Sequence, residues 1–259
     1  MDRVLAPLGR RLVDVTGREP LGAYFVLRCA DEDGPRPQPG QFYMLAAAER
    51  WGGGEDERPF LPRACSVARV DGGELHFMLE DVGPGTARLA ELREGDGLWL
   101  LGPLGKPFAP ARDGCRPVLV GGGVGTAPIV MLADALGSDA LVLLGFRDLE
   151  HAHGAELIPQ ATVATDDGSV GYHGLVTDLI PVEGGIEVFA CGPPQMLEAI
   201  RAGCERRSIP AQLALESGMA CGFGACFGCV VPTRDGGYVR LCVDGPVLGA
   251  ADLEAVHAH

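Results

Sequence analysis

Four cysteines near the C-terminal end of the chain restrict its possible folds more than any other feature. Cys221, Cys226, Cys229 and Cys242 follow the pattern C-x4-C-x2-C-x12-C. Three of the residues between the first and third cysteines are glycine, which lacks the Cβ atom that would block a tightly curled backbone. The pattern predicts that four thiolates converge on one small volume, three of them supplied by a single loop.

The spacing of the first three cysteines is that of plant-type [2Fe-2S] ferredoxins, in which four thiolates hold two iron atoms. Two other interpretations are a structural zinc site and a set of disulfides. Zinc modules usually pair their ligands as two C-x2-C knuckles, which this pattern fits poorly. Disulfides require an oxidising compartment, which nothing else in the sequence indicates. The pattern therefore favours a [2Fe-2S] cluster.

Composition narrows the class of protein. The chain has 259 residues, of which 47% are hydrophobic and 22% charged, as expected for a globular protein that is one large domain or two moderate domains with a small appendage. The net charge of -14 argues against nucleic acid or an anionic membrane surface as partner. There is no apolar run of membrane-spanning length and no signal-peptide core, and the nine cysteines then indicate a reducing cytoplasm.

The first third of the chain, residues 1–112, consists of short apolar or alternating runs separated by Gly, Pro and Asp. These runs predict an antiparallel six-stranded β-barrel. One short helix is expected at Ala87–Leu92, and residues 49–58 are expected to form a solvent loop. The six expected strands are Leu12–Val15, Ala23–Cys29, Gln41–Ala47, Ala64–Val70, Glu74–Leu79 and Gly97–Leu101.

Two pieces of this barrel carry residues suited to a flavin nucleotide. In Arg63-Ala64-Cys65-Ser66, the arginine could pair with a phosphate and the serine could hydrogen-bond a ring nitrogen. Gly83-Pro84-Gly85-Thr86 opens a helix, where backbone N–H groups and a hydroxyl can bind a pyrophosphate. Each piece taken alone is equally compatible with an ordinary turn.

The middle of the chain has the pattern of a nucleotide-binding sheet. An apolar strand, Arg116–Val120, runs into Gly121-Gly122-Gly123-Val124-Gly125-Thr126 before an apolar helix at Ile129–Leu136, and such a turn binds phosphate. The following alternation predicts a five-stranded parallel doubly wound sheet with its ligand at the C-terminal strand ends. The other expected elements are strands at Ala140–Gly145, Ala161–Thr165, Ile186–Ala190 and Gln212–Leu215, and helices at Leu175–Ile180 and Pro194–Arg207.

Two of these strand ends bear on the identity of the nucleotide. Cys191-Gly192-Pro193 places a small polarizable side chain where a nicotinamide would lie, although a lone cysteine is as compatible with plain packing. Phe146-Arg147 stands where dehydrogenases place an acidic residue, and an arginine there could meet the 2′-phosphate of NADP. The residues alone therefore do not decide whether the nucleotide is NAD or NADP.

A barrel, a nucleotide half and a cysteine-rich tail, in this order, resemble the ferredoxin–NADP reductase superfamily. Within it the chain is similar to the electron-transfer subunits of dihydroorotate dehydrogenase B, iron–sulfur flavoproteins of pyrimidine biosynthesis. The resemblance covers nearly the whole chain and is most specific at Gly85-Thr86, Leu101–Gly105, Thr165–Gly168, Glu216–Cys229 and Cys242–Val247. It divides the chain into an FAD-binding barrel (1–112), an NAD-binding domain (113–214) and a cluster module (215–259).

The resemblance implies that the chain binds FAD, one [2Fe-2S] cluster and NAD. Electrons would come from an FMN-containing catalytic subunit that oxidises dihydroorotate, in a heterotetramer with two subunits of each kind, and no side chain here would act as acid or base. The residues matched for FAD are Arg63, Ala64, Cys65, Ser66, Met78, Leu79, Glu80, Gly85 and Thr86. Those expected to bind NAD are Gly121, Gly122, Gly123, Gly125, Thr126, Cys191, Gly192 and Pro193, and those expected to bind the cluster are Cys221, Cys226, Cys229 and Cys242.

The chain departs from this family at Glu80, where an arginine is usual, and at Ala64, where a proline is usual. A carboxylate facing a pyrophosphate would be unfavourable, so either backbone groups make the contact or the flavin site is altered. Two rival functions remain. A diaphorase-type subunit of a hydrogenase, sulfur reductase or transhydrogenase complex would differ only in its partner. A zinc-bearing nucleotide-binding module would have no redox activity.

Overall fold

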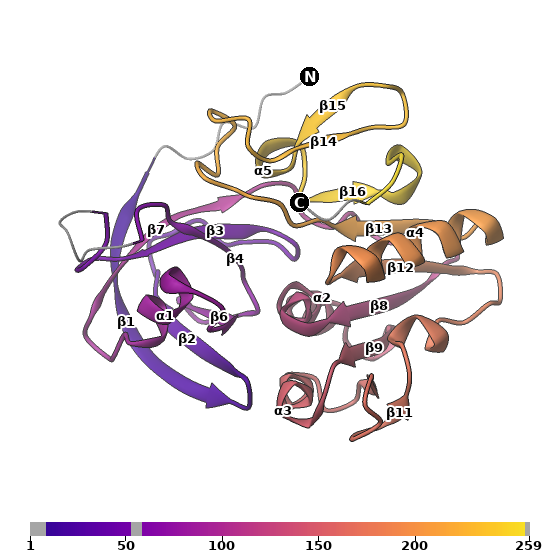
Figure 1. Cartoon of the computed structure of the whole chain (residues 1–259), viewed down its shortest axis with the longest axis horizontal. Coiled ribbons are helices and arrows are strands. Elements are labelled where there is room, and N and C mark those ends of the chain that lie inside the picture. Colours follow the sequence, from indigo (N-terminus) through magenta and orange to yellow (C-terminus); the bar gives the residue numbers. More distant parts are fainter. Residues whose placement is uncertain (1–8, 53–58, 257–259) are drawn as a thin grey trace.

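The computed structural model describes residues 9–52 and 59–256, and three parts follow one another along the chain (Figure 1). A rolled sheet comes first, an α/β sheet second, and a small tail last. Residues 53–58 of the expected solvent loop lie outside the described residues, and residues 49–52 are irregular and mostly exposed. Among the described helices, none is both long enough and apolar enough to cross a membrane.

The first sheet has seven antiparallel strands in the order β4-β3-β7-β1-β2-β6-β5, so the expectation of six was wrong. The expected strand Ala64–Val70 is in fact two strands, which stand at opposite edges of the sheet. Between them the Val67 N–H donates to Gln41 and the Ala68 N–H to His76, so the chain crosses from one edge to the other. The strands are β1 (Arg11–Leu21), β2 (Tyr24–Ala30), β3 (Phe42–Ala47), β4 (Arg63–Ser66), β5 (Arg69–Asp71), β6 (Glu74–Glu80) and β7 (Gly97–Leu104).

Alternation along these strands explains why the sheet rolls up. In β7 every second residue is buried, including Leu98 and Leu100, while the residues between them are partly exposed. Leu27, Phe77 and Leu98 are fully buried in the same core, where apolar area removed from water stabilises the fold. The short helix α1 (Pro84–Ala90) adds its buried Leu89 to this core.

The second sheet contains all five expected strands, and they are mutually parallel, as expected. Two strands that the sequence did not predict extend it: a two-residue strand, β11 (Tyr172–His173), and an antiparallel strand, β16 (Val247–Gly249), which comes from the tail. The helix expected at Leu175–Ile180 is a single 3-10 turn, η4 (Val176–Leu179). The five core strands are β8 (Arg116–Gly122), β9 (Leu141–Phe146), β10 (Thr162–Thr165), β12 (Ile186–Cys191) and β13 (Ala211–Ala214).

Helices cover both faces of this sheet. The connection from β8 to β9 crosses one face, and the connection from β12 to β13 crosses the other. Helix α2 (Thr126–Leu136) packs on the face that bears Leu119 and Phe189. Helix α4 (Pro194–Arg207) packs on the face that bears Val118 and Val188. A third, one-turn helix, α3 (Leu149–Ala152), follows β9.

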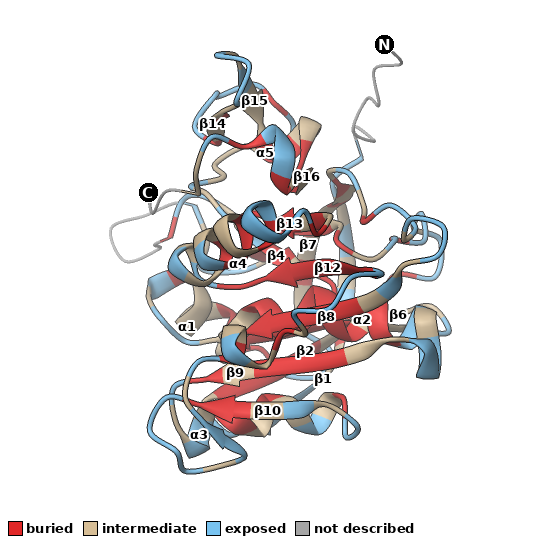
Figure 2. Ribbon diagram, turned by 90° about the vertical axis from the view of Figure 1, so that its right-hand side faces the viewer, coloured by how far each residue is buried: buried red, intermediate tan, exposed pale blue. Residues whose placement is uncertain are grey.

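The tail lies against both larger parts (Figure 2). It consists of a hairpin, β14 (Val230–Pro232) and β15 (Tyr238–Arg240), followed by the one-turn helix α5 (Leu241–Asp244) and β16. Its buried Leu241 and Leu253 share one apolar core with Leu213 of the α/β sheet and with Met44 and Leu104 of the rolled sheet. The tail is therefore held in a defined position relative to both sheets.

Candidate nucleotide cleft and cysteine centre

A cavity of about 460 Å³ lies at the C-terminal ends of the parallel strands. Open α/β sheets bind their ligands at this edge, and a cavity of this size suits a small-molecule ligand. Its walls come from the turns after β8, β9, β10 and β12, from the start of α4, and from β2 and β6 of the rolled sheet. The cleft therefore lies between the two larger parts of the molecule.

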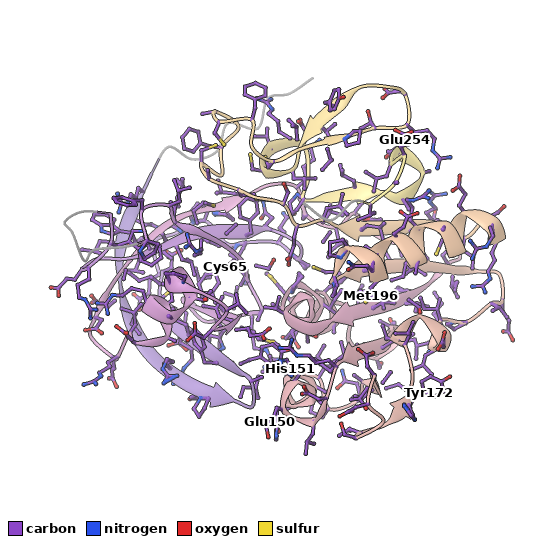
Figure 3. All side chains as sticks on the ribbon, in the orientation of Figure 1. Cys65, Glu150, His151, Tyr172, Met196 and Glu254 are labelled. Carbon is purple, nitrogen blue, oxygen red and sulfur yellow. The ribbon has the colours of Figure 1, made fainter. Side chains whose placement is uncertain are left out.

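The two loops that the sequence singled out for a dinucleotide are pressed together in this cleft. A Cβ atom placed on Gly125 would overlap the backbone of Cys191, and one placed on Gly122 would overlap Met196 and Pro193. The glycines thus permit a close approach of backbone to backbone, as expected for a turn that precedes a helix. Figure 3 labels Met196, whose side chain lies beside the cleft.

Two buried hydroxyl groups near this turn have no hydrogen-bond partner among the described residues. They belong to Tyr24 of β2 and Thr126 at the start of α2. The Tyr24 hydroxyl lies 3.8 Å from the position of a Cβ atom on Gly123, whose φ of 55° favours glycine. A buried unpaired polar group costs about 1–3 kcal/mol. Tyr24 lines the cavity, so an oxygen atom of a ligand phosphate could supply its missing partner, whereas Thr126 is fully buried beside Gly121.

Cys191 occupies the strand end as expected, but its side chain is buried in the apolar core on the α2 face. Burial raises the pKa of its thiol well above the ordinary value, and the charge of Glu216 adds to this effect. The residues that line the cleft at this point are its neighbours Gly192 and Pro193. The Cys191 thiol is therefore neutral, and it lies behind Gly192 and Pro193, which form the wall of the cleft.

Glu216 is a cleft residue whose role sequence reasoning missed. Its side chain is exposed, yet the surface that it exposes faces the cleft, where the surrounding protein limits its hydration and raises the pKa of the carboxyl. The Cys65 thiol is buried, and burial followed by the charge of Glu216 raises its pKa to about 12. Glu216 lies five residues before Cys221 of the cysteine motif, and that position was the one available signal.

A group of charged residues joins the rolled sheet to the α/β sheet at one side of the cleft. Glu80, at the end of β6, accepts a 2.6 Å hydrogen bond from the Arg147 guanidinium, which follows β9. Arg147 also donates to His151 Nε2 at 2.8 Å, and His151 Nδ1 lies 2.6 Å from Asp148. His151 Nε2 also lies 3.3 Å from the Glu80 carboxylate, so the imidazole contacts all three charged side chains of this group. Figure 3 shows His151 at the boundary between the two sheets.

Among the residues matched for FAD, the structure brings Arg63 and Gly85 together. A Cβ atom on Gly85 would overlap the Arg63 guanidinium, so this arginine lies against the first turn of α1. Its Nη1 donates to the carbonyl of Leu61 at 2.6 Å. The Thr86 hydroxyl accepts from the Val82 N–H at 2.9 Å and caps the same turn. Two predicted phosphate contacts, one from strand β4 and one from helix α1, thus lie against one another.

The other residues matched for FAD have diverse surroundings. Met78 and Leu79 are buried in two different cores, so only their backbone groups remain to meet a ligand. Ser66 is half-buried and Ala64 is exposed, on strand β4. The Glu80 side chain is bound to Arg147, which explains how a carboxylate is tolerated where relatives of this type usually carry an arginine.

The four motif cysteines form two pairs, and all four are free thiols. The sulfur atoms of Cys229 and Cys242 lie 3.2 Å apart, and the Cys226 thiol donates a hydrogen bond to Cys221. Within the described residues, no three His, Cys, Asp or Glu side chains are grouped closely enough to hold one metal ion. Two pairs suit a cluster that shares its four thiolates between two iron atoms better than they suit one tetrahedral zinc ion.

Backbone N–H groups point at two sulfur atoms of the loop. Ala225 donates to the Cys221 sulfur at 3.3 Å and Gly228 to the Cys226 sulfur at 3.4 Å. Partial burial opposes ionisation of Cys221, but N–H groups of Cys226 and Phe223 outweigh it and lower the pKa of this thiol to about 7. The loop therefore stabilises the thiolate form that binds iron.

Two of the loop glycines are required by backbone conformation. Gly222 and Gly224 have φ angles of 78° and 84°, where other residues are strained. Gly222 also lies so close to Met44 and Leu104 that a side chain would collide with the rolled sheet. Gly228 has no such φ, and a Cβ there would meet only a tight contact of 3.2 Å with a neighbouring carbonyl.

The fold and the cleft define the class of reductases that join a rolled antiparallel sheet to an α/β nucleotide-binding sheet. The structure is similar to that of an NADH-dependent reduced ferredoxin-NADP oxidoreductase, with a TM-score of 0.80 and 25% identity over 96% of this chain and 91% of that one. It also shares its fold with phthalate dioxygenase reductase, with a TM-score of 0.63 over 96% of both chains.

Sequence relatives narrow this class to one family. Residues 216–254 match the model of the iron-sulfur cluster binding domain of dihydroorotate dehydrogenase B. The chain is 40% identical to the dihydroorotate dehydrogenase B (NAD(+)) electron transfer subunit of Geobacillus thermodenitrificans, over 83% of this chain and 86% of the relative. It is 33% identical to the subunit of the same name from Clostridium perfringens, over 83% and 86%. The chain belongs to the family of dihydroorotate dehydrogenase B electron transfer subunits.

Proposed function

We propose that this chain carries electrons from a dihydroorotate-oxidising catalytic subunit to NAD+, as the name of its relatives describes for them. The proposal rests on one observation: the same chain contains a cleft suited to a nucleotide phosphate and a centre of paired cysteines. When bound, FAD exchanges a hydride with a nicotinamide and single electrons with a [2Fe-2S] cluster. The residues of this chain hold, orient and shield these groups.

The flavin side of the proposal rests on Arg63 and Gly85. We assign the guanidinium of Arg63 and the open backbone of Gly85 and Thr86 to the phosphates of FAD, since an arginine fork matches phosphate geometry. Ser66 supplies a hydroxyl, while Met78 and Leu79 offer backbone groups only. Glu80 is left out of this set, because its carboxylate is bound to Arg147.

The nucleotide side rests on the turn between β8 and α2. Its backbone N–H groups, the dipole of α2 and the unpaired hydroxyl of Tyr24 bind the pyrophosphate of NAD. Gly192 and Pro193 form the wall beside the nicotinamide, with the neutral Cys191 behind them. Glu216 faces the same space and is positioned to contact the nicotinamide end of the ligand.

Cys221, Cys226, Cys229 and Cys242 hold the iron–sulfur cluster in this proposal, with the first two on one iron and the last two on the other. The exposed Cys226 marks the side from which electrons enter. The rolled sheet and α1 form the FAD part (1–112), the parallel sheet forms the NAD part (113–214), and the tail forms the cluster module (215–259).

The catalytic partner docks over the cysteine loop in this proposal, because the electrons must enter there. Phe223 and Phe227 flank Cys226 and are 45% and 60% exposed, which is unusual for large apolar side chains. We propose that the partner contains FMN and that two subunits of each kind assemble in the cytoplasm.

The decisive experiment combines this chain with the FMN-containing catalytic subunit from the same source. Dihydroorotate should then reduce NAD+, measured as NADH absorbance, and the rate should fall to background when either subunit is omitted. If a catalytic subunit that oxidises dihydroorotate with an artificial acceptor fails to reduce NAD+ through this chain, the proposed partner is wrong. A hydrogenase, sulfur reductase or transhydrogenase complex would then be tested in its place.

A further inference from the structure

Arg147 brings a positive charge into the cleft. It is the one arginine or lysine among the described residues that line the cavity, and its side chain is 60% exposed. It follows β9, next to the strand that leads into the phosphate-binding turn. A guanidinium at this position would attract the 2′-phosphate that distinguishes NADP from NAD.

The structure shows this guanidinium to be occupied. Glu80 binds Nη2 at 2.6 Å, and His151 accepts from Nε at 2.8 Å. The Glu80 carboxylate comes from the rolled sheet, 67 residues away in the chain, and is only 22% exposed. The pairing partly neutralises Arg147 and occupies two of its hydrogen-bond donor groups, which a phosphate would otherwise use.

A second carboxylate stands where the adenosine ribose is expected. Asp166 follows β10 and lines the cavity, and its backbone N–H donates to Phe146 at 3.0 Å, so it lies directly beside Arg147. In the part of the chain that the structure describes, the Asp166 carboxylate makes no hydrogen bond or ion pair. A free carboxylate accepts hydrogen bonds from ribose hydroxyls and repels a phosphate.

We propose that Glu80 is a positioning residue for nucleotide selectivity, which withholds Arg147 from the cleft so that Asp166 selects NAD and rejects NADP. The inference rests on the proposed function, in which this cleft binds a nicotinamide dinucleotide. It assigns a purpose to the carboxylate at position 80. The residue that departs from the family pattern pairs with Arg147, the one arginine or lysine that lines the cavity among the described residues.

The alternative is that Glu80–Arg147 only ties the two sheets together. The chain offers a matched control for this, because Arg69 of β5 and Asp134 of α2 form another ion pair between the same two parts, at 2.7 Å. Neither Arg69 nor Asp134 lines the cavity. Breaking this pair loosens the same boundary without changing the charge of the cleft.

The test measures binding of two nucleotide fragments to the full chain loaded with its cofactors, by calorimetry at low ionic strength. Adenosine 2′,5′-bisphosphate represents NADP, and 5′-AMP represents NAD. Glu80→Gln should tighten the bisphosphate on the order of tenfold, equal to about 1.4 kcal/mol, and change 5′-AMP less than twofold. Asp166→Asn should shift the ratio of the two affinities in the same direction, and Asp134→Asn should leave it unchanged.

Three results would overturn the inference. The first is an unchanged ratio in both Glu80→Gln and Asp166→Asn. The second is an equal change in the affinities of both fragments in Glu80→Gln. The third is a shift of the affinity ratio in Asp134→Asn as large as that in Glu80→Gln. Either of these two results would show that the Glu80–Arg147 pair has only a structural role. If the unmodified chain binds neither fragment, the proposed nucleotide site itself is wrong, which is a distinguishable failure. The ratio of NADH to NADPH oxidation should follow the ratio of the fragment affinities.

Discussion

At the scale of single residues, Glu216 is unusual because a carboxylate has been placed in a poorly hydrated cleft. Limited hydration raises the pKa of its carboxyl. A carboxyl whose pKa is higher in the folded than in the unfolded protein contributes stability at low pH and loses it as the pH rises through the folded value. Glu216 therefore destabilises the protein at neutral pH, and its carboxylate faces the cleft.

Replacing Glu216 by glutamine should raise the melting temperature at about pH 7, because the variant carries no charge into the cleft. The difference should shrink as the pH falls toward about 4, where the native carboxyl is also neutral. Scanning calorimetry at several pH values measures this. Glu94→Gln, in an exposed turn of the rolled sheet, serves as control. A Glu216→Gln variant that is less stable at neutral pH would show that its charge is compensated in the folded protein.

Arg63 offers a test of the flavin assignment. Arg63→Ala removes a guanidinium that lies against Gly85, and a lost charged hydrogen bond costs about 1.5–3 kcal/mol. FAD affinity should therefore fall roughly tenfold to a hundredfold, measured by flavin fluorescence during titration. Arg18→Ala is the control, since Arg18 lies on β1 over the ring of Phe25. Equal FAD affinity in the two variants would remove Arg63 from the flavin site.

At the scale of elements, the start of α2 depends on a glycine that the sequence identified and the structure explains. Gly125 has an ordinary helical backbone, so its importance comes from space: a Cβ atom would overlap the Cys191 backbone. Gly125→Ala should destabilise the fold by about 1–3 kcal/mol, because the turn must move away from β12. It should also weaken 5′-AMP binding, since the N–H groups of the turn move with it.

The matched control for this substitution is Gly203→Ala in the middle of α4. Apart from its chain neighbours and the backbone of its own helix, no atom of the described residues lies within 4 Å of a Cβ at Gly203. Alanine is the better helix former there, so the variant should gain about 0.5–1 kcal/mol of stability. Urea denaturation of both variants gives the comparison. Opposite signs at the two glycines are expected, and a neutral Gly125→Ala would show that the contact between α2 and β12 is loose.

At the scale of the whole molecule, the sequence predicted what depends on local pattern. The cysteine loop, the glycine turn, the five parallel strands and α4 follow from spacing, alternation and helical periodicity within short windows. The seventh strand of the rolled sheet was missed, because Val67 and Ala68 are apolar and hide the point where the chain changes edges.

Contacts between distant segments could not be predicted in this way. Tyr24 faces the nucleotide cleft because β2 pairs with β6 in a register that places it opposite Glu80. Glu80 meets Arg147 only because the two sheets dock with these strand ends together. Register and docking are set by the packing of whole cores, to which no single stretch of sequence corresponds. The departure at Glu80 was visible in the sequence, but its partner was not.

The surface around Cys226 makes a prediction about assembly. Phe227→Asp should weaken binding of the catalytic subunit roughly tenfold or more, because exposed aromatic residues dominate interfaces when they become buried. Val182→Asp is the control, a similarly exposed apolar residue in the connection that precedes the N-terminal end of β12. Analytical ultracentrifugation of the mixed subunits measures the difference. Equal weakening by both substitutions would move the docking surface away from the cysteine loop.

The central claim is that nicotinamide, flavin and cluster exchange electrons within this one chain. Its most direct test is anaerobic reduction of the purified protein by NADH, followed by electron paramagnetic resonance. The unmodified chain should show both bleaching of the flavin and the signal of a reduced [2Fe-2S] cluster, whereas Cys226→Ser should keep the first and lose the second. A protein whose flavin is reduced without any cluster signal, or whose signal survives in Cys226→Ser, would contradict the account.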